Sequence, residues 1–237
     1  MPIHTIKLLD RATIANQTID LTFEKPDGFS FVAGQYGGFT LINPTETDDK
    51  GATRRFSFLS APDDPHIRIV TRIQTSAYKR NLEKMEPGAT IKLAGPTGNF
   101  VLHADQATPA VMIAGGIGIT PFYSMIHYAL RHEPARMITL FYGNQTLADS
   151  ALLAELNQLS QRNINFKMIP VLANPHPEWE GEKGFITDEI LVKHIPDLDQ
   201  PIFYVCGSPA MVNAMQQMLR ELQIANERVK VEDFPGY

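Results

Sequence analysis

Residues 110–121 read AVMIAGGIGITP, an apolar run that breaks into three glycines and ends in a threonine and a proline. An apolar run of this length that leads into glycines predicts a buried parallel strand followed by a tight turn. Glycine has no Cβ, so the backbone N–H groups of such a turn can approach an anion closely. The helix predicted for residues 121–131 adds unpaired N–H groups, and Pro121 suits its first position because no hydrogen bond is lost there.

The spacing of these glycines matches a dinucleotide-binding turn only in part. Gly116 and Gly118 fit the first two glycines of G-x-G-x-x-G, but Pro121 stands in place of the third. The next predicted strand runs into YGNQT and lacks the acidic residue that usually binds the ribose. The pattern indicates a dinucleotide site unlike that of the ordinary dehydrogenases, with a plain strand-to-helix turn as the alternative.

Around this segment the chain divides into two halves of different character. Within residues 1–104, short β-prone segments are separated by turn-rich pieces such as KPDG, which favours a small closed antiparallel β-barrel. One helix is expected there from Ala77 to Met85, with Ser76 as its N-cap. Residues 105–237 predict an α/β domain, a parallel sheet with helices on both faces. Its expected strands are 110–114, 137–142, 164–171 and 201–206, and its expected helices are 121–131, 148–160 and 208–223.

The composition limits the possible functions. The chain has 237 residues, of which 43% are hydrophobic, and no run long and apolar enough to span a bilayer, so a cytoplasmic folded protein is expected. A single cysteine, Cys206, excludes an internal disulfide and an all-cysteine metal site, and no metal is expected. The net charge of −5 divides into +1 for residues 1–104 and −6 for the remainder. This excludes a broad nucleic-acid-binding surface and leaves room for a basic patch on the first half that binds an acidic partner.

The segment 54–57, Arg-Arg-Phe-Ser, combines groups that suit a flat, phosphorylated ligand. Strand alternation puts Arg54 and Phe56 on one face and Arg55 and Ser57 on the other. Arginine offers fixed donors to a phosphate, an aromatic ring can lie on a conjugated ligand, and a serine can bond its polar edge. The alternative is an exposed strand with a buried Phe56 and solvated arginines.

Two further segments are candidates for ligand binding. Ser76, Ala77 and Lys79 open the expected barrel helix, whose first N–H groups form a second anion site, unless Ser76 is only an ordinary N-cap. Residues 204–211, YVCGSPAM, form another strand that enters a glycine turn and a helix. Ligands of open α/β sheets bind at the carboxyl ends of the strands, so Cys206 would share an edge with residues 115–120. A buried small apolar side chain is the alternative for Cys206.

In this order, the motifs resemble those of the ferredoxin–NAD(P)H reductase family of flavoproteins over nearly the whole chain. That family carries a proline where the dehydrogenase fingerprint carries its third glycine. The matching positions are Arg54, Phe56, Ser57 and Ser60 of the flavin motif, Ser76 at a helix start, Gly95 to Gly98 followed by Phe100, Gly115 to Pro121, Cys206, Gly207, Pro209 and Met211, and Glu232 with Phe234.

The resemblance implies an oxidoreductase that holds FAD along the barrel and NADH or NADPH on the α/β domain. Hydride would pass from the nicotinamide to the flavin between the domains. Ser57, Cys206 and Glu232 would be the catalytic residues. The residues implied in cofactor binding are Arg54, Phe56, Ser57, Val70, Thr71, Thr75, Ser76, Ala77, Lys79, Gly115, Gly116, Gly118, Thr120, Pro121, Gly143, Asn144, Cys206, Gly207, Pro209, Met211, Phe234 and Tyr237.

The sequence departs from the family pattern in three places. Phe56 replaces the usual tyrosine, which keeps the ring and loses the hydroxyl. Asn144 and Gln145 follow Gly143 where a cation would bind the 2′-phosphate of NADPH, so NADH is favoured. The iron–sulfur module of many relatives is absent from the sequence. Electron transfer to a separate ferredoxin- or flavodoxin-like carrier, or to an oxygenase component, is therefore expected.

Three functional readings remain open at this point. The first is a reductase with tightly bound FAD, the second is a flavin reductase that uses flavin as a diffusing substrate, and the third is a redox-sensing or partner-binding module without catalysis. The resemblance also implies that a C-terminal aromatic residue, Phe234 or Tyr237, stacks on the flavin and moves aside for the nicotinamide. A frayed terminus is the alternative for this tail.

Overall fold

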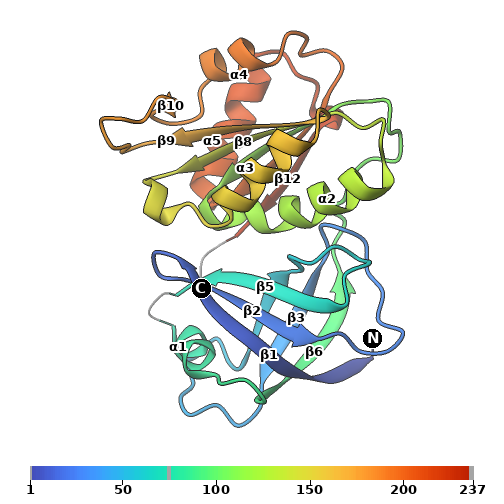
Figure 1. The fold of residues 1–237 in the computed structure, drawn as a ribbon, viewed down its shortest axis with the longest axis vertical. Coiled ribbons are helices and arrows are strands. Elements are labelled where there is room, and N and C mark those ends of the chain that lie inside the picture. Colours follow the sequence, from blue (N-terminus) through green and yellow to red (C-terminus); the bar gives the residue numbers. More distant parts are fainter. Residues whose placement is uncertain (1, 74–75, 235–237) are drawn as a thin grey trace.

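The computed structural model describes residues 2–73 and 76–234, which form two domains, each built on one sheet (Figure 1). The first sheet has six antiparallel strands in the order β4-β3-β6-β1-β2-β5. The second has six parallel strands in the order β10-β9-β8-β7-β11-β12. The predicted fold class, an antiparallel β domain followed by a parallel α/β domain, is confirmed.

The first domain surrounds an aromatic core. Alternate residues of its strands point inward, and Phe39, Phe58 and Leu93 are fully buried there. The helix α1 begins after the N-cap Ser76, as predicted, and its Tyr78 packs into this core. The elements are β1 (Ile3–Ala15), β2 (Thr18–Glu24), β3 (Tyr36–Leu41), β4 (Thr53–Ser57), β5 (His66–Arg72), α1 (Ala77–Lys84) and β6 (Thr90–Thr97).

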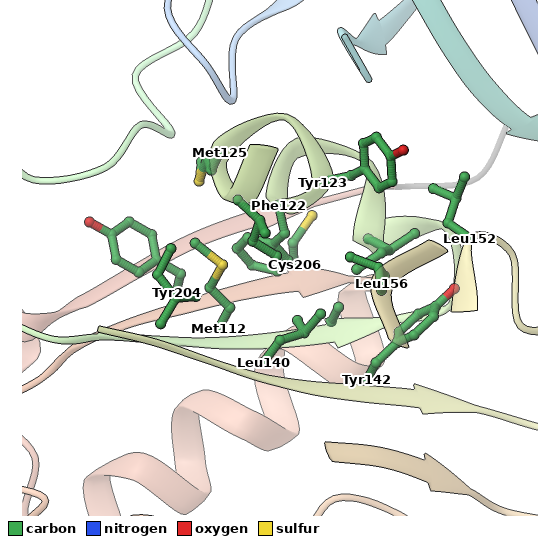
Figure 2. Close-up of a cluster of buried hydrophobic side chains, with 14 of the residues drawn as sticks. Met112, Phe122, Tyr123, Met125, Leu140, Tyr142, Leu152, Leu156, Tyr204 and Cys206 are labelled. Carbon is green, nitrogen blue, oxygen red and sulfur yellow. The ribbon is translucent and has the colours of Figure 1, made fainter. Parts of the chain in front are cut away.

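The second domain has helices on both faces of its sheet. Two helices pack on the face turned toward the barrel, where Phe122 and Leu156 meet Cys206 and Leu140 (Figure 2). Two others cover the opposite face around Phe141 and Val205. The elements are β7 (Ala110–Gly115), α2 (Ile119–His132), β8 (Ile138–Asn144), α3 (Leu153–Arg162), β9 (Phe166–Leu172), β10 (Glu182–Lys183), α4 (Asp188–His194), β11 (Ile202–Gly207), α5 (Pro209–Glu221) and β12 (Val229–Asp233), with 3₁₀ turns η1 (Gly116–Gly118), η2 (Leu147–Asp149) and η3 (Asn226–Arg228).

Some boundaries differ from the expected ones for identifiable reasons. Helix α2 begins at Ile119, so Pro121 is its third residue rather than its first. Proline costs nothing there, because the first four N–H groups of a helix have no intrahelical partner. Helix α3 begins at Leu153 because η2 precedes it and Leu152 has a φ of +63°. Strands β10 and β12 and helix α4 were not expected: β10 and α4 are too short for a periodic pattern, and the outermost strand β12 carries three charged residues.

Several direct contacts hold the two domains together. Ser124 Oγ of α2 donates a buried hydrogen bond of 2.6 Å to the carbonyl of Ser60 in the barrel. Asn16, in the turn between β1 and β2, donates through its backbone N–H to the carbonyl of Ala148 at 2.8 Å. Arg131 Nη1 lies 3.0 Å from Asp64. Contacts at three separate places leave the domains little freedom to rotate against each other.

The segment between β6 and β7 is also fixed to the second domain. The fully buried Arg136 donates from Nη2 to the carbonyl of His103 at 2.7 Å and forms an ion pair with Glu133. The backbone N–H of His103 donates to Tyr204 Oη at 2.8 Å. Lys230 Nζ donates to the carbonyl of Val101 at 3.3 Å. The connecting segment is therefore part of the packed structure rather than a free linker. Within the described part of the chain, no helix has the length and apolar character needed to cross a bilayer.

The turn after β7 requires glycine for three different reasons. A Cβ at Gly115 would overlap the sulfur of Met211, and Gly116 has a φ of +51°, a conformation that favours glycine. A Cβ at Gly118 would overlap the backbone carbonyl of Cys206. The glycines therefore allow η1 to lie directly against the end of β11. This contact brings the two glycine turns, after β7 and after β11, to the same edge of the sheet.

We expect Gly118→Ala to destabilise the protein by about 1–3 kcal/mol, because the new methyl group must displace backbone rather than a flexible side chain. Gly38→Ala is the matched control, since a Cβ there meets its nearest neighbours at 3.8 Å and its φ is not in the left-handed region. Urea unfolding followed by circular dichroism measures both variants. Equal unfolding midpoints for Gly118→Ala and Gly38→Ala would contradict the proposed contact.

Candidate functional site

A cavity of about 1290 Å³ lies between the two domains and receives side chains from both. This volume exceeds the roughly 300–1,000 Å³ typical of a pocket for one drug-sized ligand. It is large enough for parts of two cofactors to meet. Of the residues predicted to bind cofactors or to act in catalysis, those that line it are Arg54, Phe56, Ser57, Val70, Thr71, Lys79, Gly115, Gly116, Thr120, Gly143, Asn144, Gly207, Pro209, Met211, Glu232 and Phe234.

Arg54 is held in place by the loop that precedes its strand. Its Nη1 donates to the carbonyls of Lys50, Gly51 and Thr53 at 2.8–2.9 Å, and its Nη2 pairs with Asp48 at 2.9 Å. The guanidinium also lies 5.1 Å from the centre of the Tyr78 ring. Arg54 therefore orders this loop as well as lining the cavity, and its removal would affect both.

Phe56 and Ser57 end strand β4 at the cavity. Phe56 is half-buried, packs edge-on against Phe39 and also lies near the ring of Tyr78. Ser57 is 4% exposed, and its Oγ has no hydrogen-bond partner among the described residues. A buried hydroxyl without a partner costs free energy, so a ligand atom at this point would stabilise it. This observation fits the polar edge of a flavin.

Lys79 is, with Arg54, one of two buried cations that line the barrel side of the cavity. It lies in the first turn of α1, is 7% exposed, and lines the cavity. Burial and the positive charges of Arg54 and Arg72 lower the pKa of Lys79 to about 8. An anion beside Lys79 would offset the repulsion between Lys79, Arg54 and Arg72. A diphosphate carries the negative charge needed for this.

The first N–H groups of α1 are less available than the sequence predicted. Ser76 Oγ accepts from the N–H of Lys79 at 3.3 Å, and Asp48 accepts from the N–H of Ala77 at 3.1 Å. Ser76 and Ala77 do not line the cavity. The side chain of Lys79, rather than these two residues, presents positive charge to a ligand.

The second domain contributes its two glycine turns. Gly115, Gly116 and Thr120 follow β7, and Gly207 with Pro209 follows β11. Met211 bridges the turns, because its sulfur fills the space that a Cβ at Gly115 or Gly207 would need. Gly116 is the open position, because a Cβ there would meet nothing within 4 Å, and its backbone can be approached closely by a phosphate group.

Glu232 and Cys206 are neighbours in register on β12 and β11. Burial and the charge of Asp233 raise the pKa of Glu232 to about 7, and its Oε2 is buried without a hydrogen-bond partner among the described residues. Cys206 is fully buried, and burial raises the pKa of its thiol well above the ordinary value. Glu232 lines the cavity, whereas Cys206 lies behind its surface in the apolar cluster of Figure 2.

The other predicted residues have different positions. Gly118 and Pro121 lie outside the cavity lining and have structural contacts. Thr75 and Tyr237 lie outside the described residues. The roles assigned to individual residues remain predictions.

The structure adds residues that the sequence analysis missed. Arg72, at the end of β5, lines the cavity; its Nη2 donates to the carbonyl of Asp149 at 3.2 Å, while its buried Nε has no partner among the described residues. Tyr36 and Phe185 also line the cavity, and Phe185 is 73% exposed. In the sequence, the only signal for Arg72 was its position at the end of a predicted strand, and the only signal for Phe185 was a phenylalanine directly after Gly184.

Comparison with known proteins identifies the family. A family model described as an oxidoreductase NAD-binding domain matches residues 112–217. Ferredoxin–NADP reductase B of Sorangium cellulosum is 30% identical over 230 residues, which cover 91% of this chain and 91% of that protein. The chain belongs to the ferredoxin–NAD(P)H reductase family. It is an oxidoreductase, a flavoprotein that binds FAD and a nicotinamide nucleotide.

Other members of this family differ in length and in their named activity. NADH-cytochrome b5 reductase 1 of Debaryomyces hansenii is 30% identical over 215 residues, which cover 89% of this chain and 75% of that protein. The reductase component DmpP of phenol 2-monooxygenase from a Pseudomonas species is 32% identical over 210 residues, and the match covers 84% of this chain and only 57% of that protein. The shared region is therefore the two-domain unit described here.

Solved structures agree with the fold over its whole extent. The Amycolatopsis cytochrome P450 reductase GcoB superposes with a TM-score of 0.85 at 26% identity, covering 98% of this chain and 70% of that one. A ferredoxin NADP+ reductase from Neisseria gonorrhoeae, with bound FAD and NADP, superposes with a TM-score of 0.80 at 22% identity and covers 98% of both chains. The cavity residues fit FAD on their own chemistry, since Lys79 and the buried Ser57 hydroxyl offer a cation and a polar group that a ligand would satisfy.

We expect FAD affinity to fall with rising pH above about pH 8. A diphosphate favours charged Lys79 and raises its pKa, so binding above the free-state pKa of about 8 must take up a proton. The apparent dissociation constant should rise by up to about tenfold per pH unit between pH 8 and 9 and stay constant between pH 6 and 7. Fluorescence titration of the FAD-free protein measures it.

Lys79→Arg is the matched variant, because an arginine stays charged throughout this range. Its FAD affinity should not change between pH 8 and 9. A wild-type affinity independent of pH, or an unchanged slope in Lys79→Arg, would rule out a diphosphate beside Lys79.

Proposed function

We propose that this protein is an NAD(P)H-dependent reductase that holds FAD tightly and passes electrons to a separate carrier protein. The observation that supports this most is a pair of buried polar groups without a hydrogen-bond partner among the described residues, Ser57 Oγ of the barrel and Glu232 Oε2 of the α/β domain, which line one cavity from its two sides. Two domains that each bring such a group to one cavity suit a reaction between two bound rings.

FAD, when bound, accepts hydride from the nicotinamide and releases electrons one at a time, and this chemistry belongs to the cofactors. The chain aligns them. Ser57 would bond the polar edge of the flavin, and the half-buried ring of Phe56 would support the flavin face. The turns at Gly116 and Gly207 would hold the nucleotide by its phosphates.

Glu232 would control protonation beside the reacting rings. A pKa of about 7 leaves this carboxyl partly protonated at neutral pH, so it can both donate and accept a hydrogen bond. Cys206 adds no charge at this point, because its buried thiol stays protonated. Its proposed part is to shape the surface beneath the nicotinamide.

The end of the chain contributes an aromatic residue to the same cavity. Phe234 lines it and donates its backbone N–H to the carbonyl of Gly207 at 2.9 Å. This bond places the ring directly after Glu232 and beside the proposed nucleotide turn. We propose that Phe234 covers the flavin face that the nicotinamide must reach.

Two measurements distinguish this function from the flavin reductase. Acid release from the purified protein identifies the flavin, and anaerobic addition of NADH or NADPH tests its reduction. The proposal expects FAD that remains bound through gel filtration and loses its visible absorbance when either nucleotide is added. FMN as the bound flavin, or free flavin as the species consumed in turnover, would contradict it.

We further propose that NADH is the preferred nucleotide. All the cations that line the cavity among the described residues, Arg54, Arg55, Arg72 and Lys79, come from the barrel. The part of the lining at the end of β8 and after β10 offers Asn144, Gln145, Gly184 and Phe185 instead, without a cation for a 2′-phosphate.

We expect the wild-type protein to have a higher kcat/KM for NADH than for NADPH. Gln145→Arg should raise kcat/KM for NADPH by about tenfold relative to NADH, since it supplies a charge-assisted contact of about 1.4 kcal/mol. Gln145→Leu is the control, because leucine is similar in size and has no charge. It should not raise kcat/KM for NADPH relative to NADH. A wild-type preference for NADPH above about tenfold would overturn the assignment.

A further inference from the structure

Asp48 places a negative charge next to the cations that line the barrel side of the cavity. It lies in the loop between β3 and β4, and its carboxylate contacts two elements. Its Oδ1 lies 2.9 Å from Nη2 of Arg54, and its Oδ2 accepts from the N–H of Ala77, the first residue of α1, at 3.1 Å. Asp48 does not itself line the cavity, so it would act on a bound ligand through its charge and through Arg54.

The carboxylate of Asp48 remains ionised at neutral pH. Burial alone would raise the pKa of Asp48, but the hydrogen bonds from Arg54 and from backbone N–H groups hold it below the ordinary value. Arg80 of α1 also feels the charge of Asp48, but its guanidinium is paired with Glu46 at 2.6 Å. Asp48 is therefore a fixed negative charge beside Arg54.

The loop that carries Asp48 is also held by contacts that do not involve its carboxylate. Asn81 of α1 donates to the carbonyl of Glu46 at 2.9 Å and accepts from the N–H of Thr45 at 2.9 Å. Nη1 of Arg54 donates to three backbone carbonyls within residues 50–53. Removal of the charge at position 48 should therefore leave the loop in place.

The two common flavin cofactors differ in the charge that they would bring to this place. Each phosphate of the FAD diphosphate has one ionised oxygen, whereas the phosphomonoester of FMN carries a charge of about −1.5 to −2 at pH 7, because its second pKa is about 6. The energy between two charges scales with their product, so Asp48 repels a doubly charged phosphate about twice as strongly as a singly charged one. Donors for the extra charge are also reduced, since the N–H groups of Ala77 and Lys79 are bonded to Asp48 and Ser76.

We propose that Asp48 selects FAD over FMN by repelling a doubly charged phosphomonoester beside Arg54, an inference that rests on the proposed function. FAD distributes its charge over two phosphates that can meet two cations, Arg54 and Lys79, whereas FMN concentrates the same charge on one phosphate. If Asp48 served only to position Arg54, its loss would affect the two flavins equally.

Asp48→Asn tests this selection, because the amide keeps the size of the side chain and can still accept from the N–H of Ala77 without carrying a charge. Asp49→Asn is the matched control, an equal loss of charge at the exposed next residue of the same loop. FAD and FMN are titrated separately into the flavin-free protein by fluorescence at pH 5.5 and pH 7.5. The dissociation constant for FMN divided by that for FAD is the readout, since this ratio removes effects common to both flavins.

We expect Asp48→Asn to lower this ratio about tenfold at pH 7.5, with Asp49→Asn within about twofold of wild type. The wild-type ratio should also fall from pH 7.5 to pH 5.5, because the FMN phosphate takes up a proton, and it should fall less in Asp48→Asn. The pH dependence of the wild type tests the proposal without any substitution.

Three results would overturn the selection by Asp48. They are equal weakening of both flavins in Asp48→Asn, the same change of the ratio in Asp48→Asn and Asp49→Asn, and a wild-type ratio that does not fall at pH 5.5. Tighter binding of FMN than of FAD by the wild type would instead disprove the proposed FAD-dependent function.

Discussion

The buried hydrogen bond from Ser124 to the carbonyl of Ser60 joins the two domains, and the cavity between them depends on their relative orientation. A small rotation of the domains would break this bond while both groups stayed buried away from water, and that is costly. With Asn16 bound to Ala148 and Arg131 paired with Asp64, it fixes one orientation of the barrel and the α/β sheet. Ser57 and Glu232 can line one cavity only because that orientation is fixed.

The two domains bring different charged groups to the cavity. Among the described residues, every cation that lines the cavity comes from the barrel. One of them is Lys79, whose pKa is lowered by burial and by neighbouring positive charges, and a bound anion would stabilise its charged form. The α/β domain supplies uncharged glycine turns and a carboxyl, Glu232, whose pKa is close to neutral.

Much of this arrangement could be predicted from the sequence, because its patterns are local. The glycines at 115–118 and the alternation at 54–57 predicted both strand ends and the faces of Arg54 and Ser57. Arg72 could not be found in this way, since its place in the cavity depends on contact between β5 and the loop after β8. Nor could the sequence show that Asp48 accepts a hydrogen bond from the N–H of Ala77, 29 residues away. This bond leaves fewer N–H groups of α1 available to a phosphate.

The most direct test of the account is a crystal structure of the protein with FAD and the oxidised nucleotide. The account predicts one FAD in the cavity between the domains, with its diphosphate beside Lys79 and the polar edge of its ring at Ser57 Oγ. The nucleotide diphosphate should lie on the turns at Gly116 and Gly207, with the nicotinamide between Glu232 and the flavin. A flavin bound elsewhere, or a nicotinamide on the side of the flavin away from Glu232, would contradict it.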